Sequence, residues 1–218
     1  TGKARNLPTK APSRLNNPDL TPAPPEIDAA AVETAQAALE ELPAERRNHR
    51  IKGEDVIILA GPKTKATANA RIIDLVKKLT SLKRLPTPEE KKLLAQYVGW
   101  GQLPDVLDSY KAKYGDEAWK KKWGSLYNRV KKLLTDEEWR LAERSTLNAH
   151  YTDRGVINGM WDLVRHLGFE GGQIGEFGAG VGHFNGLQPD DIAAKSSWTM
   201  VEKDGISGQI LRLLYPQD

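Results

Sequence analysis

Apolar residues recur at helical spacing in the centre of the chain. Between residues 68 and 82 they recur with the period of a helix, at Ile72, Ile73, Leu75, Val76 and Leu79. Residues 103–134 supply two further helical stretches, with breaks expected near Gly115 and Gly124. The pattern therefore predicts a helical region over residues 48–147.

Two short polar motifs predict where helices begin. In TPEE (87–90) and TDEE (135–138) a threonine is followed three residues later by a glutamate. In such a capping box the threonine side chain accepts from the N3 amide, and the glutamate accepts from the N-cap amide. We expect the first helix to run to about Val98.

The pattern changes after residue 147. An amphipathic stretch at 154–168 precedes a short apolar run at 171–177 that enters a glycine turn. A second apolar run at 197–204 ends in two acids, and another amphipathic stretch follows at 206–215. This alternation predicts an α/β fold: a helical N-terminal region, then the first part of a doubly wound, Rossmann-like sheet over residues 148–218.

The first 47 residues are different in composition. Residues 1–27 hold six of the 13 prolines and few apolar residues, which is typical of a disordered segment or linker. The alanine-rich stretch 28–42 favours one helix. Just beyond this region, the apolar run 55–61 predicts a short strand.

Composition narrows the function classes. The chain has 218 residues, a net charge of +3 and no cysteine. Disulfides and thiolate metal sites are thus excluded, and the four histidines have no ligand-like spacing. No apolar run has the roughly 20 residues of a membrane span. We expect a soluble, intracellular protein with no membrane partner, and the mildly basic charge permits a nucleic-acid partner.

The segment IGEFGAGVGHFNG (174–186) carries the clearest chemistry. An acid, Glu176, ends the apolar run, and glycines follow at alternate positions 178, 180 and 182. Glycines after a strand let the backbone approach a ligand, and an acid ending the next strand, here Glu202 or Asp204, can bind ribose hydroxyls. A dinucleotide would suit a G-x-G-x-x-G spacing, but the third glycine is one place late. An acid followed by spaced glycines suits S-adenosylmethionine, whose positive charges a carboxylate attracts. A loop that only connects strand to helix is the remaining alternative.

Three stretches of the sequence carry a family resemblance. YVGWG (97–101), LNAHYT (147–152) and VEKDGISGQILRLLYP (201–216) resemble the large methylase–helicase proteins of phages, plasmids and conjugative elements. The likeness covers about residues 67–218 and concerns their amino-terminal adenine-specific DNA methyltransferase region. It implies S-adenosylmethionine as cofactor, DNA as partner, and the cytoplasm of a bacterial or phage-infected host.

The resemblance also implies a set of cofactor-binding residues. A tyrosine–threonine pair would close over the methionine end, an acid and its neighbour would begin the glycine loop, and a second acid would bind the ribose. The positions are Tyr151, Thr152, Glu176, Phe177, Gly178, Gly180, Gly182, Glu202 and, as the weaker of the two ribose candidates, Asp204.

The chain departs from the family pattern in ways that bear on activity. Phe177 stands where the family has a proline, and Gly175 where it has an apolar residue. The asparagine–proline–proline–aromatic motif that grips a flipped adenine does not occur in the sequence. We expect this chain alone to be inactive in methyl transfer, with the remainder of the enzyme on the same gene or another chain. The alternative is a non-catalytic DNA- or protein-binding module of phage or plasmid origin with a methyltransferase-like scaffold.

Three further features have two interpretations each. Trp100 either packs in the core beside a helix cap at Gly99 or covers a cofactor or base. His183 either makes a local hydrogen bond or touches the ligand. The lysine- and aromatic-rich stretch 109–132 is either a solvated helical surface with its tryptophans in the core or a DNA-binding surface.

Overall fold

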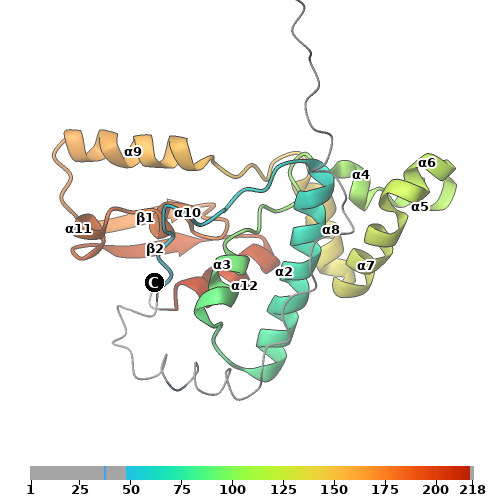
Figure 1. The fold of residues 1–218 in the computed structure, drawn as a ribbon, viewed down its shortest axis with the longest axis horizontal. Coiled ribbons are helices and arrows are strands. Elements are labelled where there is room, and N and C mark those ends of the chain that lie inside the picture. Colours follow the sequence, from blue (N-terminus) through green and yellow to red (C-terminus); the bar gives the residue numbers. More distant parts are fainter. Residues whose placement is uncertain (1–36, 38–47, 217–218) are drawn as a thin grey trace, which may run out of the picture.

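The computed structural model describes residue 37 and residues 48–216 (Figure 1). The expected linker and most of the helix predicted at 28–42 lie outside the described residues. Over the described part the protein is a mixed α/β chain, mostly helical, with a two-stranded parallel sheet. None of the helices in that part has the length and apolar character to cross a membrane.

Helices α2 (Pro62–Leu82) and α3 (Pro88–Leu94) form the centre of the molecule. Proline at N1 opens α2, and its apolar face, including Ile72, Ile73, Val76 and Leu79, is fully buried. The capping box of α3 is confirmed, because Thr87 accepts from the Glu90 amide and Glu90 accepts from the Thr87 amide. This helix ends four residues earlier than predicted, because the Gln96 and Tyr97 amides donate to carbonyls three residues back and form a turn. The Val98 amide then donates to the Asn69 side chain.

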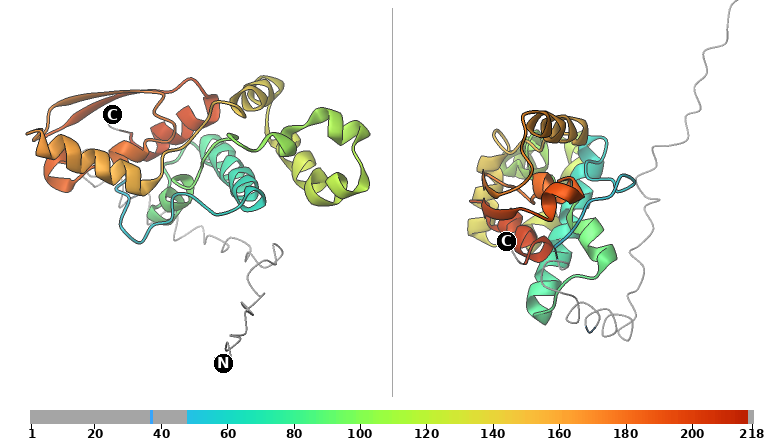
Figure 2. Two further views of the ribbon diagram at one scale, coloured as in Figure 1. Left: turned by 90° about the horizontal axis from the view of Figure 1, so that it is seen from above. Right: turned by 90° about the vertical axis from the view of Figure 1, so that its left-hand side faces the viewer.

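A group of short helices follows and forms one end of the molecule (Figure 2). They are α4 (Pro104–Leu107), α5 (Ser109–Tyr114), α6 (Glu117–Trp119), η3 (Lys120–Gly124), α7 (Ser125–Leu133) and α8 (Asp136–Ser145). The capping box at Thr135 and Glu138 is confirmed at the start of α8. The break expected near Gly115 is present, but the one near Gly124 is wrong. A π-helical turn, η3, joins α6 to α7 without interruption and keeps Trp119 and Trp123 in the core.

The last part of the chain carries the sheet. Helix α9 (Arg154–His166) leads to β1 (Gln173–Phe177), and the short helices α10 (His183–Gly186) and α11 (Asp190–Ala193) connect it to β2 (Ser197–Val201). The strands are parallel, with Gln173 opposite Ser197 and Phe177 opposite Val201. Helix α12 (Gly205–Leu214) follows β2. Parallel pairing brings the carboxyl ends of both strands to the same edge, where the glycine turn and Glu202 lie.

Two apolar clusters support this arrangement. The larger one joins the helices of residues 62–142 to α12 and to Ala179 and Val181 of the glycine turn. The smaller one contains Ile157 and Trp161 of α9 and Ile192 of α11. The helical region therefore packs against the glycine turn.

The strand predicted at 55–61 is wrong. Residues 48–61 form no helix or strand up to the start of α2, although Ile57 is buried. The backbone of this segment is held by a side chain instead. Arg154 donates to the carbonyl oxygens of Lys52, at 2.8 Å, and Asp55. With these carbonyls occupied, the apolar run packs as an irregular segment.

Candidate cofactor-binding site

The glycine turn after β1 is a sharply folded loop. Gly178, Gly180 and Gly182 all have positive φ, at 81°, 59° and 78°, a conformation that favours glycine. The amides of Gly178 and Ala179 donate to the Val201 carbonyl at 2.8 and 3.1 Å. The loop is thus tied to the end of β2 by its own backbone.

Glu202 fixes the same loop from the other side. Its Oε2 accepts from the Gly180 amide and its Oε1 from the Asp204 amide, both at 2.7 Å. Asp204 has a different task, because it is the N-cap of α12 and accepts from the Ser207 amide at 2.7 Å. The geometry therefore separates the two acids: Glu202 holds the loop and Asp204 begins a helix.

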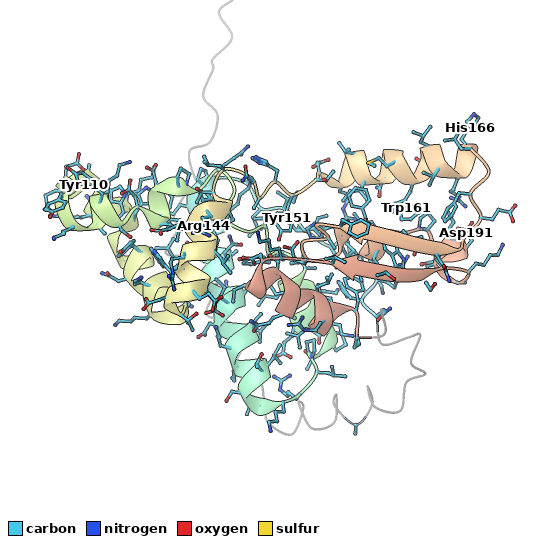
Figure 3. The ribbon with its side chains drawn as sticks, turned by 180° about the vertical axis from the view of Figure 1, so that it is seen from behind. Tyr110, Arg144, Tyr151, Trp161, His166 and Asp191 are labelled. Atoms are coloured by element: carbon cyan, nitrogen blue, oxygen red, sulfur yellow. The ribbon has the colours of Figure 1, made fainter. Side chains whose placement is uncertain are left out.

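A cavity of about 420 Å³ lies above the loop, a volume within the range of small-molecule sites. It brings together most of the residues that the sequence predicts, namely Tyr151, Thr152, Glu176, Gly178, Gly180, Glu202 and Asp204. Figure 3 shows Tyr151 at the junction between the sheet and the helical region.

Phe177 and Gly182 do not line this cavity. Alternation along β1 turns Glu176 toward the cavity and Phe177 to the opposite face, where it is 86% exposed. Gly182 is a packing position, since a Cβ there would come within 2.4 Å of the Tyr215 ring. Its carbonyl also accepts from the Tyr215 hydroxyl at 2.7 Å.

Tyr151 packs over the turn between two glycines. A Cβ on Gly180 or on Gly99 would come within 3.0 or 3.1 Å of its ring. The ring packs edge-on against His183, and the hydroxyl is 3.2 Å from Ser207 Oγ. Burial raises the pKa of Tyr151, so its hydroxyl stays protonated and neutral.

Glu176 has the most perturbed carboxyl of the site. Burial, reinforced by the charge of Glu202, raises the pKa of Glu176 to about 7. Its Oε2 is buried and finds no hydrogen-bond partner among the described residues. A buried acceptor without a partner is costly unless a ligand or solvent satisfies it. This position suits a ligand that carries a donor or a positive charge.

Several lining residues lie outside the predicted cofactor-binding set. Tyr97 and Gly99 of the YVGWG stretch line the cavity, whereas Trp100 is 1% exposed and packs in the core. Gly99 is not a helix cap, because α3 ends at Leu94. Arg144 lines the cavity from the end of α8 (Figure 3), where nothing local in the sequence predicts proximity to the loop. Asn148 also lines it and belongs to the LNAHYT stretch that carries the resemblance.

His183 links the glycine turn to the helical region. Its Nε2 lies 2.7 Å from the Ala95 carbonyl, which joins the glycine turn to the segment after α3. Burial lowers the pKa of His183 to about 4, so the ring is neutral at physiological pH. It lines the cavity, but its hydrogen bond is not the local one expected of a loop histidine, because Ala95 is 88 residues away in the sequence.

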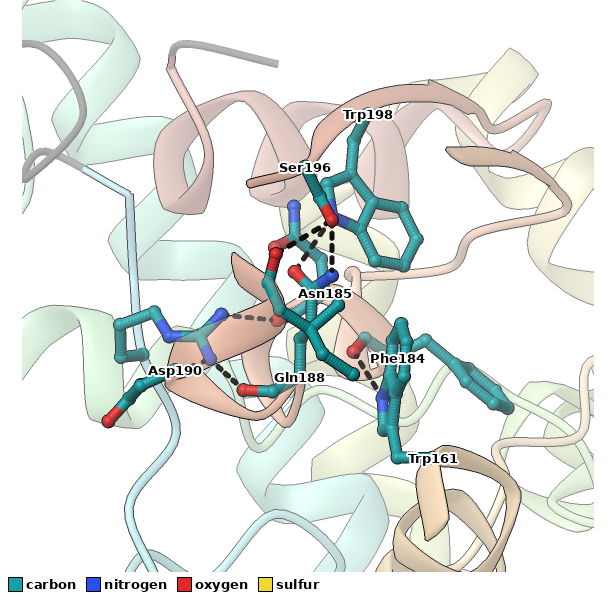
Figure 4. A network of polar contacts seen from close by, with 9 residues as sticks. Trp161, Phe184, Asn185, Gln188, Asp190, Ser196 and Trp198 are labelled. Atoms are coloured by element: carbon teal, nitrogen blue, oxygen red, sulfur yellow. Dashed lines mark hydrogen bonds and ion pairs between the residues drawn. The ribbon is translucent and has the colours of Figure 1, made fainter. Parts of the chain in front are cut away.

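The crossover between the strands is held by a polar network (Figure 4). Trp198 Nε1 donates to Gln188 Oε1 at 3.1 Å, and Gln188 Nε2 donates to Ser196 Oγ at 3.1 Å. On the α9 side, Trp161 Nε1 donates to the Phe184 carbonyl at 3.1 Å. These bonds satisfy polar groups of the crossover and fix the position of α10 relative to the strands.

Comparison with known proteins gives one weak likeness. Over 151 residues the chain is 24% identical to the Defense against restriction protein B of Escherichia phage P1. The matched region is 69% of this chain but spans only about 5% of that protein's length. No model of a protein family matches the chain, and no solved structure matches it.

The charges at the cavity limit the ligands that suit it. Three acidic side chains, Glu176, Glu202 and Asp204, and two basic ones, Arg144 and Lys203, line it. The acids outnumber the cations, so the lining as a whole favours a ligand that carries positive charge. Each oxygen of Glu202 accepts one backbone amide and keeps a further lone pair for a hydroxyl donor. The residues present therefore fit S-adenosylmethionine, which has a ribose, an ammonium and a sulfonium. Among the described residues, no three histidine, aspartate or glutamate side chains gather as a metal site.

Proposed function

We propose that this chain is the cofactor-binding part of an S-adenosylmethionine-dependent adenine-N6 DNA methyltransferase, built on the opening of a Rossmann-like sheet. The observation that carries the proposal is the bond of Glu202 to Gly180 at the base of the cavity of about 420 Å³. It sets an acid at the end of the second strand beside a glycine loop at the end of the first, which is where open α/β sheets bind ligands.

Each residue of the site has a proposed role. Glu202 would accept from the ribose hydroxyls, and Glu176 would face the positively charged end of the cofactor. Tyr151 and Thr152 would close the cavity beside the loop. The cofactor supplies a methyl group on a sulfonium. The contribution of this chain is to bind and orient it, which is a matter of positioning.

An exposed face of the two-stranded sheet supports a further segment of the enzyme as partner. Parallel sheets ordinarily have both faces covered. Here one face of the two strands is open, with Phe177 86% and Val201 48% exposed. Further strand–helix units would cover this face with their helices and would carry the adenine-binding residues that the resemblance implies and this sequence does not contain.

The phage relative supports the same biology. Its printed name describes defence against restriction. The likeness is low, and that protein is far longer than this chain. It is therefore a supporting observation beside the geometry of the cavity.

Calorimetric titration with S-adenosylmethionine tests the proposal. We expect saturable heat with the unmodified chain and none with Glu202→Ala, while Glu170→Ala, which removes an exposed glutamate on the surface, leaves the heat unchanged. Circular dichroism establishes that each variant is folded. Tighter binding of NAD⁺ than of S-adenosylmethionine, or no saturable heat from the folded chain, would overturn the proposal.

The second candidate is a non-catalytic DNA-binding module on a methyltransferase-like scaffold. The observation that favours it is the unequal distribution of charge, because the stretch 109–133 holds eight basic and two acidic residues. Absence of S-adenosylmethionine binding together with salt-dependent DNA binding would select this candidate.

A further inference from the structure

The helices α5, α6, η3 and α7, residues 109–133, form a basic lobe at the end of the molecule away from the sheet (Figures 1 and 2). The lobe has eight basic and two acidic residues, so its net positive charge exceeds the +3 of the whole chain. Charge concentrated on one part of a protein creates a local field that attracts a partner of opposite sign.

Internal ion pairs neutralise only part of this charge. Lys111 pairs with Asp105 at 2.7 Å, Lys120 with Glu117 at 3.0 Å and Lys131 with Asp136 at 3.7 Å. The other five cations are exposed, and none has an ion pair within the described part of the chain: Lys113, Lys121, Lys122, Arg129 and Lys132. Arg129 and Lys132 are three residues apart on α7 and so lie on one side of that helix.

The aromatic residues of the lobe divide into two groups. Trp119 and Trp123 are buried, at 9% and 3% exposure, as expected of core residues. Tyr110 and Tyr114 are 73% and 62% exposed, and their rings lie 5.1 Å apart on successive turns of α5. Lys113 Nζ is 5.0 Å from the centre of the Tyr114 ring. The fold therefore places two tyrosine rings in water beside unpaired cations.

We propose that the basic lobe is a binding surface for nucleic acid. The unpaired lysines and Arg129 contact phosphates, and Tyr110 and Tyr114 offer faces on which unpaired bases stack. Cations that follow the backbone and aromatic rings that stack on bases are the combination used for single strands. An acidic peptide would use the cations but gives no role to the exposed ring pair.

This surface lies outside the cavity, and none of its residues lines it. The inference rests on different residues from the cofactor site of the leading proposal, and it deepens the second candidate, which uses the same basic stretch. The two are tested separately, because nucleic-acid binding is measured without S-adenosylmethionine and cofactor binding is measured without nucleic acid.

Fluorescence anisotropy with a labelled single-stranded 20-mer tests the charge. We expect the double variant Lys121→Glu/Lys122→Glu to raise Kd about tenfold or more and to make the salt dependence less steep. The control, Lys78→Glu/Lys83→Glu, makes the same charge change on exposed residues at the end of α2 and should change Kd less than twofold. Equal weakening by both double variants would show non-specific attraction and overturn the proposal.

The tyrosine pair tests the stacking. Tyr110→Ala/Tyr114→Ala should raise Kd for the single strand about tenfold and Kd for a duplex of the same sequence less than twofold, since paired bases present no free faces. Thermal melting monitors folding, which these exposed positions should leave intact. Poly-glutamate is the probe for an acidic peptide. If poly-glutamate displaces the oligonucleotide as effectively as nucleic acid of equal charge does, the surface is not a nucleic-acid site. The same conclusion follows if the tyrosine variant binds the single strand with unchanged Kd.

Discussion

Glu202 Oε2 accepts from the Gly180 amide at 2.7 Å, which joins the end of β2 to the turn that follows β1. A bond to a charged acceptor is stronger than one between neutral groups. Without it, the Gly180 amide would lose the partner that fixes the turn. The cavity depends on this bond before any ligand arrives.

The first prediction concerns Glu202→Gln. We expect the free energy of unfolding to fall by about 1 to 2 kcal/mol, toward the low end for a bond to a charged group because Glu202 is only partly buried. Hydrogen exchange at the Gly180 amide should become faster. Glu170→Gln, on the exposed surface, is the control. Unchanged protection of Gly180 would show that Val201 alone holds the turn.

The second prediction compares two glycines of the turn. Gly178 and Gly182 both have positive φ, so alanine at either costs about 1 to 2 kcal/mol of backbone strain. A Cβ on Gly178 meets nothing within 4 Å, but on Gly182 it approaches the Tyr215 ring to 2.4 Å. Gly182→Ala should therefore cost about 1 to 3 kcal/mol more in urea unfolding. Equal losses would mean that Tyr215 moves aside freely.

The sequence predicted correctly those features that depend on residues close together in the chain. Both capping boxes are short motifs whose partners lie three residues apart, and both are confirmed at Thr87 and Thr135. The segment after α3 is held by Asn69, which is 29 residues from Val98, and no local pattern reports that bond. Gly124 was expected to break a helix, but Trp123 beside it is buried in the core and the helix continues.

The same distinction applies to the candidate site. The placement of Glu202 beside the glycine turn follows from parallel strands ending at one edge. The outward direction of Phe177 follows from strand alternation once β1 is known, but the resemblance alone did not reveal it. Gly182 packs against Tyr215, 33 residues further on, and Arg144 reaches the cavity from the end of α8. These contacts arise from tertiary packing, which the linear pattern does not encode.

The third prediction compares the two capping boxes. Thr87→Ala and Thr135→Ala should each reduce the free energy of unfolding by about 1 kcal/mol. Glu90 also forms a buried ion pair with Arg84 at 2.7 Å, with side-chain exposures of 4% and 11%. Glu90→Gln leaves that guanidinium without its counter-charge and should cost about 3 to 5 kcal/mol.

Glu138→Gln is the matched substitution in the second box. Its partner, Lys77, is 34% exposed, so solvent screens the lone cation. We expect the loss in urea unfolding to be smaller than for Glu90→Gln. A loss at Glu138 equal to that at Glu90 would show that burial of the pair does not decide the cost.

The fourth prediction concerns pH and Glu176. In the folded protein the pKa of this carboxyl is about 7, whereas its ordinary value is 4.5. Between these values the folded chain holds a proton that the unfolded chain has lost, so the contribution of Glu176 to stability falls as pH rises from 4.5 to 7. Glu176→Gln removes this dependence. The difference in free energy of unfolding between variant and unmodified chain should therefore shift in favour of the variant across that window.

The comparison with Glu176→Gln is necessary because histidines act in the opposite direction. Burial lowers the pKa of His49 and of His183 to about 4, so both reduce stability as pH falls below 6.5. The unmodified protein and the Glu176→Gln variant both contain these histidines. The difference between their free energies of unfolding therefore isolates the contribution of Glu176.

The same ionisation predicts the pH dependence of cofactor binding. A cationic ligand beside Glu176 should bind more tightly as pH rises through 7, because the carboxyl then acquires its charge. Calorimetric titrations with S-adenosylmethionine at pH 6 and pH 8 should therefore show a lower Kd at pH 8, and Glu176→Gln should abolish the difference. If the unmodified chain and the variant respond to pH alike, the cation does not lie beside Glu176, and the ligand must enter the cavity in another orientation.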